Sequence, residues 1–147
     1  MGRVPGRLSV TSETIGATPD LAEALTVSAG DPVIHLERVL LADGQRIGLE
    51  STYLPSYRFG HFVDTFDPST SLYAAIRAEG VTFGTAVERI ETVLPSPREA
   101  DLLESTTAMP MLLLNRRSLD TDGVPVEIVR ALYRGDRVAF EALLTDR

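Results

Sequence analysis

The chain contains no cysteine, so its 147 residues can form neither a disulfide nor a thiolate nucleophile or metal ligand. This absence fits a reducing compartment, and we expect a cytoplasmic protein. No apolar run approaches the roughly 20 residues that a membrane-spanning helix needs. The opening residues 1–5 lack the apolar segment of a secretory signal peptide, so neither a membrane partner nor export is expected.

Lysine is also missing, and all 14 basic side chains are arginine. Each cation is therefore a planar guanidinium group, which can form paired hydrogen bonds to a carboxylate or a phosphate. The 21 acidic residues bring the formal net charge to −7. Neutralising the phosphates of a nucleic acid requires a basic surface, so we do not expect this chain to hold DNA by itself.

Signatures of catalysis and of metal binding are absent from the sequence. The only histidines, His35 and His61, lack the spacing of metal ligands, and there is no glycine-rich phosphate loop, nucleophile elbow or paired-carboxylate motif. We therefore predict no cofactor, no metal and no enzymatic activity. The length and the apolar fraction of 44% are those of one globular domain with a core.

Alternating apolar residues and turn signals predict a chain made mostly of strands. Asp43-Gly44 and Asp122-Gly123 each lie between two such runs, and Asp-Gly is a strong hairpin signal. Helical patterns with caps and stops occur at 18–25, 67–80 and 98–105, and one helical turn is expected near 60–64. The predicted strands cover residues 7–15, 33–41, 45–53, 82–94, 109–119, 124–134 and 137–145.

Two halves of the sequence match each other. Pro19 and Pro97 are 78 positions apart, as are Arg38 and Arg116, and each half reads as strand, short helix, strand, Asp-Gly turn, strand. Two such units joined edge to edge would form one antiparallel β-sheet flanked by short helices. We therefore predict an α+β fold built from two pseudo-repeated units.

The predicted helix at 67–80 begins with three hydroxyl residues, Ser69, Thr70 and Ser71, and is stopped by Gly80. Such hydroxyls can cap the first turn. Together with the unpaired N–H groups of a helix start, they can also bind an anion. The sequence leaves both interpretations open.

Charged residues interrupt the apolar faces of the predicted strands. Arg38 shares a face with Ile34 and Leu36, and Glu127 shares one with Val129. Because an isolated buried charge is costly, each must be paired or must face a polar ligand. Either an arginine–glutamate pair holds the sheet together, or these side chains line a binding site with Glu50.

The order and spacing of several short motifs resemble the UTRA (UbiC transcription regulator-associated) domain. This is the effector-binding domain of HutC-subfamily regulators in the GntR superfamily of transcription factors. The motifs are Gly30-Asp31-Pro32-Val33, Leu36-Glu37-Arg38, Ala42-Asp43-Gly44, Glu50-Ser51, Leu54-Pro55, Ser71-Leu72-Tyr73, Asp122-Gly123-Val124-Pro125-Val126-Glu127 and Tyr133-Arg134-Gly135-Asp136-Arg137.

This resemblance implies a chorismate-lyase-like fold around a small-molecule pocket. It also implies a homodimer that reaches operator DNA through an N-terminal winged helix-turn-helix, which we expect to lie outside residues 1–147. The effector is expected to be a sugar phosphate, an amino sugar or a carboxylate metabolite. The positions that contact ligand in the sugar-phosphate-binding members correspond here to Arg38, Glu50, Ser71, Tyr73, Glu127 and Tyr133.

One departure from the family pattern bears on the effector. Sugar-phosphate binders often carry a second arginine two residues after the first, and here that position is Leu40. A singly charged carboxylate is therefore expected to compete well with a phosphate. Two other functions stay open: a lyase acting on a chorismate-like carboxylate on the same fold, and a dimerisation domain that binds no ligand.

Overall fold

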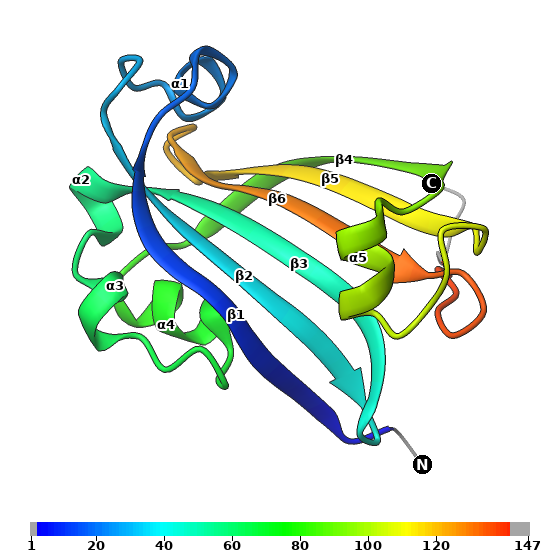
Figure 1. Ribbon diagram of the computed structural model, residues 1–147. Coiled ribbons are helices and arrows are strands. Elements are labelled where there is room, and N and C mark those ends of the chain that lie inside the picture. Colours follow the sequence, from blue (N-terminus) through cyan, green and yellow to red (C-terminus); the bar gives the residue numbers. More distant parts are fainter. Residues whose placement is uncertain (1–2, 142–147) are drawn as a thin grey trace, which may run out of the picture.

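The alternating segments and the two Asp-Gly turns build one six-stranded antiparallel sheet with the strand order β1-β2-β3-β6-β5-β4 (Figure 1). The structure is a computed structural model and describes residues 3–141. The strands are β1 (Pro5–Gly16), β2 (Pro32–Ala42), β3 (Gln45–Pro55), β4 (Phe83–Val93), β5 (Met111–Asp120) and β6 (Pro125–Arg134). The helices are α1 (Pro19–Leu25), α2 (Ser56–Phe59), α3 (Phe62–Thr65), α4 (Leu72–Ala78) and α5 (Pro97–Leu102).

The strand order confirms the predicted α+β fold and its repeat. One half of the sheet is β1-β2-β3, the other is β4-β5-β6, and the halves meet where β3 pairs with β6. Helix α1 follows β1 as α5 follows β4. In the two hairpin turns Gly44 and Gly123 have φ values of 78° and 77°, a conformation that a side chain disfavours.

Helices cover the sheet on both faces. On one face, Phe59, Phe62 and Ile76 from α2, α3 and α4 pack on apolar residues of β2 and β3. On the other face, α1 and the end of α5 pack through Leu25 and Leu103. Because neighbouring residues of a strand point to opposite faces, β2 supplies Ile34 to the first core and Val33 to a core on the second face.

Two local predictions need correction. The single turn expected near 60–64 is two short helices, α2 and α3. Residues 137–141 of the last predicted strand are not in a strand, and residues 142–145 lie outside the described part of the chain. The backbone N–H groups of Arg137 and Val138 donate to the carbonyl of Arg134, so they form a turn instead of a strand ladder. Among residues 3–141, no helix is long and apolar enough to cross a membrane.

Candidate functional site

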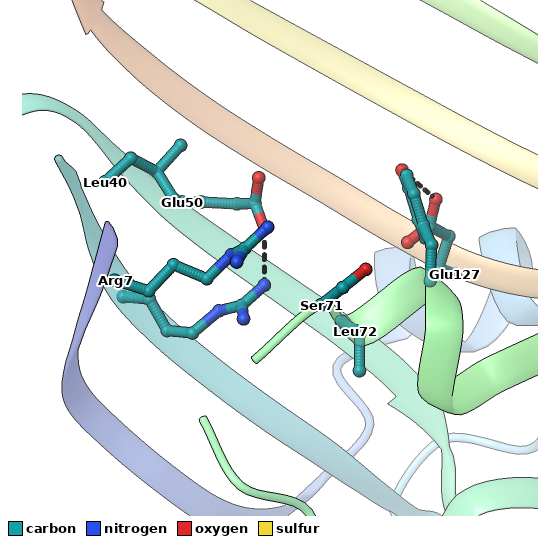
Figure 2. A pocket seen from close by; sticks show the side chains of 8 residues that line it. Arg7, Leu40, Glu50, Ser71, Leu72 and Glu127 are labelled. Atoms are coloured by element: carbon teal, nitrogen blue, oxygen red, sulfur yellow. Dashed lines mark hydrogen bonds and ion pairs between the residues drawn. The ribbon is translucent and has the colours of Figure 1, made fainter. Parts of the chain in front are cut away.

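A cavity of about 130 Å³ lies between the sheet and the start of α4. Five of the six residues singled out from the sequence line it, and Tyr133 does not. Figure 2 shows Arg7 and Glu50 on one side of the cavity and Glu127 on the other, with Ser71 and Leu72 between them. The lining residues are Arg7, Arg38, Leu40, Glu50, Ser71, Leu72, Tyr73 and Glu127.

Strand pairing places the basic end of this cavity. In the antiparallel pair β2–β3, Arg38 is directly opposite Glu50. In the pair β1–β2, Arg7 is opposite Leu40, and Ser9 is opposite Arg38. Side chains two residues apart on a strand share a face, so these residues all point toward α4.

Arg38 is held by three protein acceptors. Its side chain is 3% exposed, and its Nη2 lies 3.0 Å from Oε1 of Glu50. Its Nη1 donates to the carbonyl oxygens of Thr70, at 3.0 Å, and Pro68, at 3.3 Å. Burial lowers the pKa of Arg38, and the neighbouring carboxylate of Glu50 opposes this effect. The ion pair considered from the sequence is therefore formed, and carbonyl groups of the loop before α4 complete it.

Of the three hydroxyl groups before α4, only that of Ser71 caps the helix. The Ser71 hydroxyl accepts a hydrogen bond from the backbone N–H of Ala74 at 3.2 Å, and Ser71 lines the cavity. The hydroxyls of Ser69 and Thr70 instead donate to the side chain and the backbone carbonyl of Asp67. The anion seat of three hydroxyls considered from the sequence is therefore not formed, and only Ser71 lies at the cavity.

Glu127 is a buried carboxyl group that is only partly satisfied. It is 0% exposed, and its Oε1 accepts from the hydroxyls of Tyr73, at 2.8 Å, and Ser118, at 2.9 Å. Its Oε2 has no hydrogen-bond partner among the described residues. Burial raises the pKa of Glu127, although the hydrogen bond from Ser118 and the charge of Arg116 act in the opposite direction.

Comparison with known proteins identifies the family of this chain. The family model of the UTRA domain matches residues 1–139. The chain belongs to the UTRA domain family. The UTRA resemblance inferred from the short motifs is thus confirmed.

Relatives of this UTRA domain are transcriptional repressors. The HTH-type transcriptional repressor PhnF of Mycolicibacterium smegmatis is 48% identical over 97% of this chain and 59% of its own length. The HTH-type transcriptional repressor NagR of Bacillus subtilis is 27% identical over 95% of this chain and 57% of its own. This chain thus spans less than two thirds of the curated relatives it matches.

The crystal structure of the effector domain of PhnF from Mycobacterium smegmatis has a TM-score of 0.95 to this UTRA domain, at 47% identity. It covers 97% of this chain and 88% of that one. These relatives place the domain among the effector domains of transcription regulators, and none of those named here is described as an enzyme.

Arg116 is a residue of this UTRA domain that sequence reasoning missed. Its Nε lies 3.5 Å from Oε1 of Glu127, its Nη1 lies 3.0 Å from Glu88, and its Nη2 donates to the Tyr73 hydroxyl. It helps to fix the acidic end of the cavity. The signal was available, because Arg116 occupies the same place in the second sequence unit as Arg38 does in the first.

Tyr133 lies on the cavity face of the sheet but outside the cavity lining of this UTRA domain. It is opposite Gly48 on β3, where its ring fills the space that a side chain at position 48 would need. Burial raises the pKa of Tyr133. Within residues 3–141, no group of three or more histidine, aspartate or glutamate side chains could hold a metal ion.

Proposed function

We propose that this UTRA domain binds a small anionic metabolite in the cavity and thereby regulates a DNA-binding protein. The observation that carries this proposal is the buried carboxyl group of Glu127, whose Oε2 has no partner, at the wall of a cavity that has arginines at its other end. A buried polar atom without a partner costs roughly 1–3 kcal/mol. A hydroxyl or ammonium group of a ligand would remove that cost.

The chemistry of the two ends defines the effector class. The basic end, with Arg38 and Ser71, takes an anionic group, and the acidic end, with Glu127 and Tyr73, takes a hydroxyl or an amine. Sugar phosphates, amino sugars and carboxylate metabolites all fit this description. A cavity of about 130 Å³ is smaller than most ligand pockets, so the ligand is short or the loop before α4 moves to admit it.

Regulation of DNA binding requires a DNA-binding domain and two arrangements of the dimer. We propose that the domain forms a homodimer in the cytoplasm. We also propose that it acts on operator DNA through a helix-turn-helix domain, because PhnF and NagR are named as HTH-type transcriptional repressors. With a net charge of −7, this domain does not retard DNA by itself. The effector changes operator affinity because it binds one arrangement of the dimer more tightly than the other.

Calorimetry on the chain with glucosamine 6-phosphate, glucosamine and citrate tests the binding function. We expect at least one of them to bind, and Glu127→Gln to weaken an ammonium-bearing ligand by about 1.5–3 kcal/mol, as for hydrogen bonds to charged groups. Glu91→Gln is the matched control, because Glu91 is on the exposed strand β4 and is absent from the cavity lining. Equal affinity in wild type and Glu127→Gln would remove Glu127 from the site, and failure of every probe would favour a domain that only dimerises.

We also propose that the site binds without catalysis, because the relatives are named as repressors. Incubation of the chain with chorismate is expected to release no 4-hydroxybenzoate. Steady turnover would establish the lyase alternative instead.

A further inference from the structure

Arg7 is a second guanidinium at the basic end of the cavity. It comes from β1, is half-buried and lines the cavity together with Arg38. Because Arg7 is opposite Leu40 and Ser9 is opposite Arg38, the two arginines are diagonal neighbours on one face of the β1–β2 pair. Figure 2 shows the Arg7 side chain extending from β1 toward Glu50.

The two arginines differ in how they are neutralised. Arg38 pairs with Glu50 and donates to two backbone carbonyls. Among residues 3–141, Arg7 has neither a carboxylate within 4.0 Å nor a hydrogen bond from its side chain to a protein acceptor. Burial is the main reason that the pKa of Arg38 is lowered, and the positive charge of Arg7 acts in the same direction.

We propose that Arg7, and not Arg38, is the residue that neutralises the anionic group of the effector, while Arg38 positions the loop before α4. This inference rests on the function proposed above, because it assigns one contact of the same ligand. The three charged groups at this end, Arg7, Arg38 and Glu50, sum to a single positive charge. One oxyanion, a carboxylate or a phosphate, can then pair with the fork of Arg7 without displacing Glu50 from Arg38.

Leu40 fits this arrangement. It forms an apolar wall directly across the strand pair from Arg7 and offers the guanidinium no acceptor of its own. Position 40 carries no cation, and Arg7 on the neighbouring strand β1 supplies one in its place. Because the basic end of the cavity has a net charge of only +1, a carboxylate binds nearly as well as a phosphate.

The test uses the full chain and three short probes in calorimetry: phosphoethanolamine, 4-aminobutyrate and ethanolamine, the last of which lacks the anionic group. We expect Arg7→Gln to weaken phosphoethanolamine and 4-aminobutyrate by about 10- to 100-fold and to leave ethanolamine unchanged. Arg7→Lys should restore part of the affinity. Arg89→Gln removes the same charge from a side chain that is 77% exposed on β4, and it should change nothing.

Folding does not confound this experiment. Removing Arg7 leaves no described partner unpaired, so the melting temperature of Arg7→Gln should stay near that of the wild type. Wild-type affinity in Arg7→Gln would overturn the assignment of Arg7 while leaving the proposed function intact. Failure of the wild type to bind any anionic probe, including glucosamine 6-phosphate and citrate, would overturn both.

Discussion

The hydroxyl of Tyr73 donates a hydrogen bond to Oε1 of Glu127 at 2.8 Å and thereby joins helix α4 to strand β6. Both residues line the cavity, so the bond closes its acidic end. The position of α4 over the sheet is therefore coupled to the state of one buried carboxyl group. This relationship leads to predictions for each partner.

Replacing Tyr73 by phenylalanine removes the hydroxyl and keeps the ring that packs edge-on against Phe83. This hydroxyl donates to Glu127 and accepts from Arg116, so we expect the free energy of unfolding, measured by urea denaturation, to fall by about 1–3 kcal/mol, the usual net value of two hydrogen bonds. Tyr57→Phe is the control, because Tyr57 is 66% exposed and its variant should match the wild type. An equal loss in both variants would show that the hydrogen bonds of the Tyr73 hydroxyl add no stability.

The raised pKa of Glu127 predicts the direction in which folding stability changes with pH. Because its pKa is higher in the folded protein than in the unfolded chain, its contribution to stability is complete at low pH. That contribution is lost as the pH rises from the ordinary carboxyl pKa through the raised one. Glu127→Gln cannot ionise and should therefore gain stability relative to the wild type as the pH rises above the ordinary carboxyl pKa of about 4. A difference between the two proteins that stays constant with pH would contradict the raised pKa.

Arg38→Met removes one member of a buried ion pair and two donors to backbone carbonyls. It should lower the free energy of unfolding by about 3–5 kcal/mol, because the carboxylate of Glu50 then lacks its partner in a mostly dry site. Glu50 is only 17% exposed, so water cannot fully replace the guanidinium.

The double variant Arg38→Met/Glu50→Leu separates two effects: loss of the Arg38–Glu50 ion pair, and loss of the hydrogen bonds that Arg38 donates to the loop before α4. Replacing both charges by apolar groups should recover most of the stability. If the double variant is as unstable as the single one, the bonds from Arg38 to the loop before α4 dominate instead.

Gly48→Ala tests the close approach of β3 to the Tyr133 ring. A Cβ atom at position 48 would lie 2.8 Å from Cδ1 of Tyr133, which is closer than carbon atoms can pack. We expect a loss of about 1–3 kcal/mol from overpacking, measured by thermal or urea unfolding. Gly6→Ala should be better tolerated, because its Cβ would meet only side-chain atoms of Leu41, the nearest being Cδ1 at 3.3 Å. A Tyr133→Leu change should relieve part of the Gly48→Ala defect, and no relief would locate the strain elsewhere.

The sequence predicted the fold better than it predicted the site. Strand alternation placed Arg38 and Glu127 on the correct faces, and the Asp-Gly turns located both hairpins, because these signals are local. Arg7 was missed because its place at the cavity depends on the register between β1 and β2. That pairing contains an irregularity between Ser9 and Thr11, and sequence alternation does not reveal it.

Other errors had similar causes. The predicted strand from residue 137 alternates correctly, but the backbone of its first residues is used by a turn that begins at Arg134. Tyr133 lies on the cavity face as its alternation requires, yet its ring fills the space above Gly48 and stays outside the cavity lining. The ligand contacts assigned to the six residues singled out from the sequence stay predictions until an effector is bound.

The seam between β3 and β6 has a consequence for how such a site can be assembled. Arg7, Arg38 and Glu50 belong to the first half-sheet and Glu127 to the second, and within the sheet the two halves pair through β3 and β6. A metabolite bound at both the basic and the acidic end of the cavity would therefore bridge the two half-sheets. Neither half-sheet carries a complete site. If the chain were divided between α4 and β4 and its fragments mixed, the same metabolite would be expected to promote their reunion.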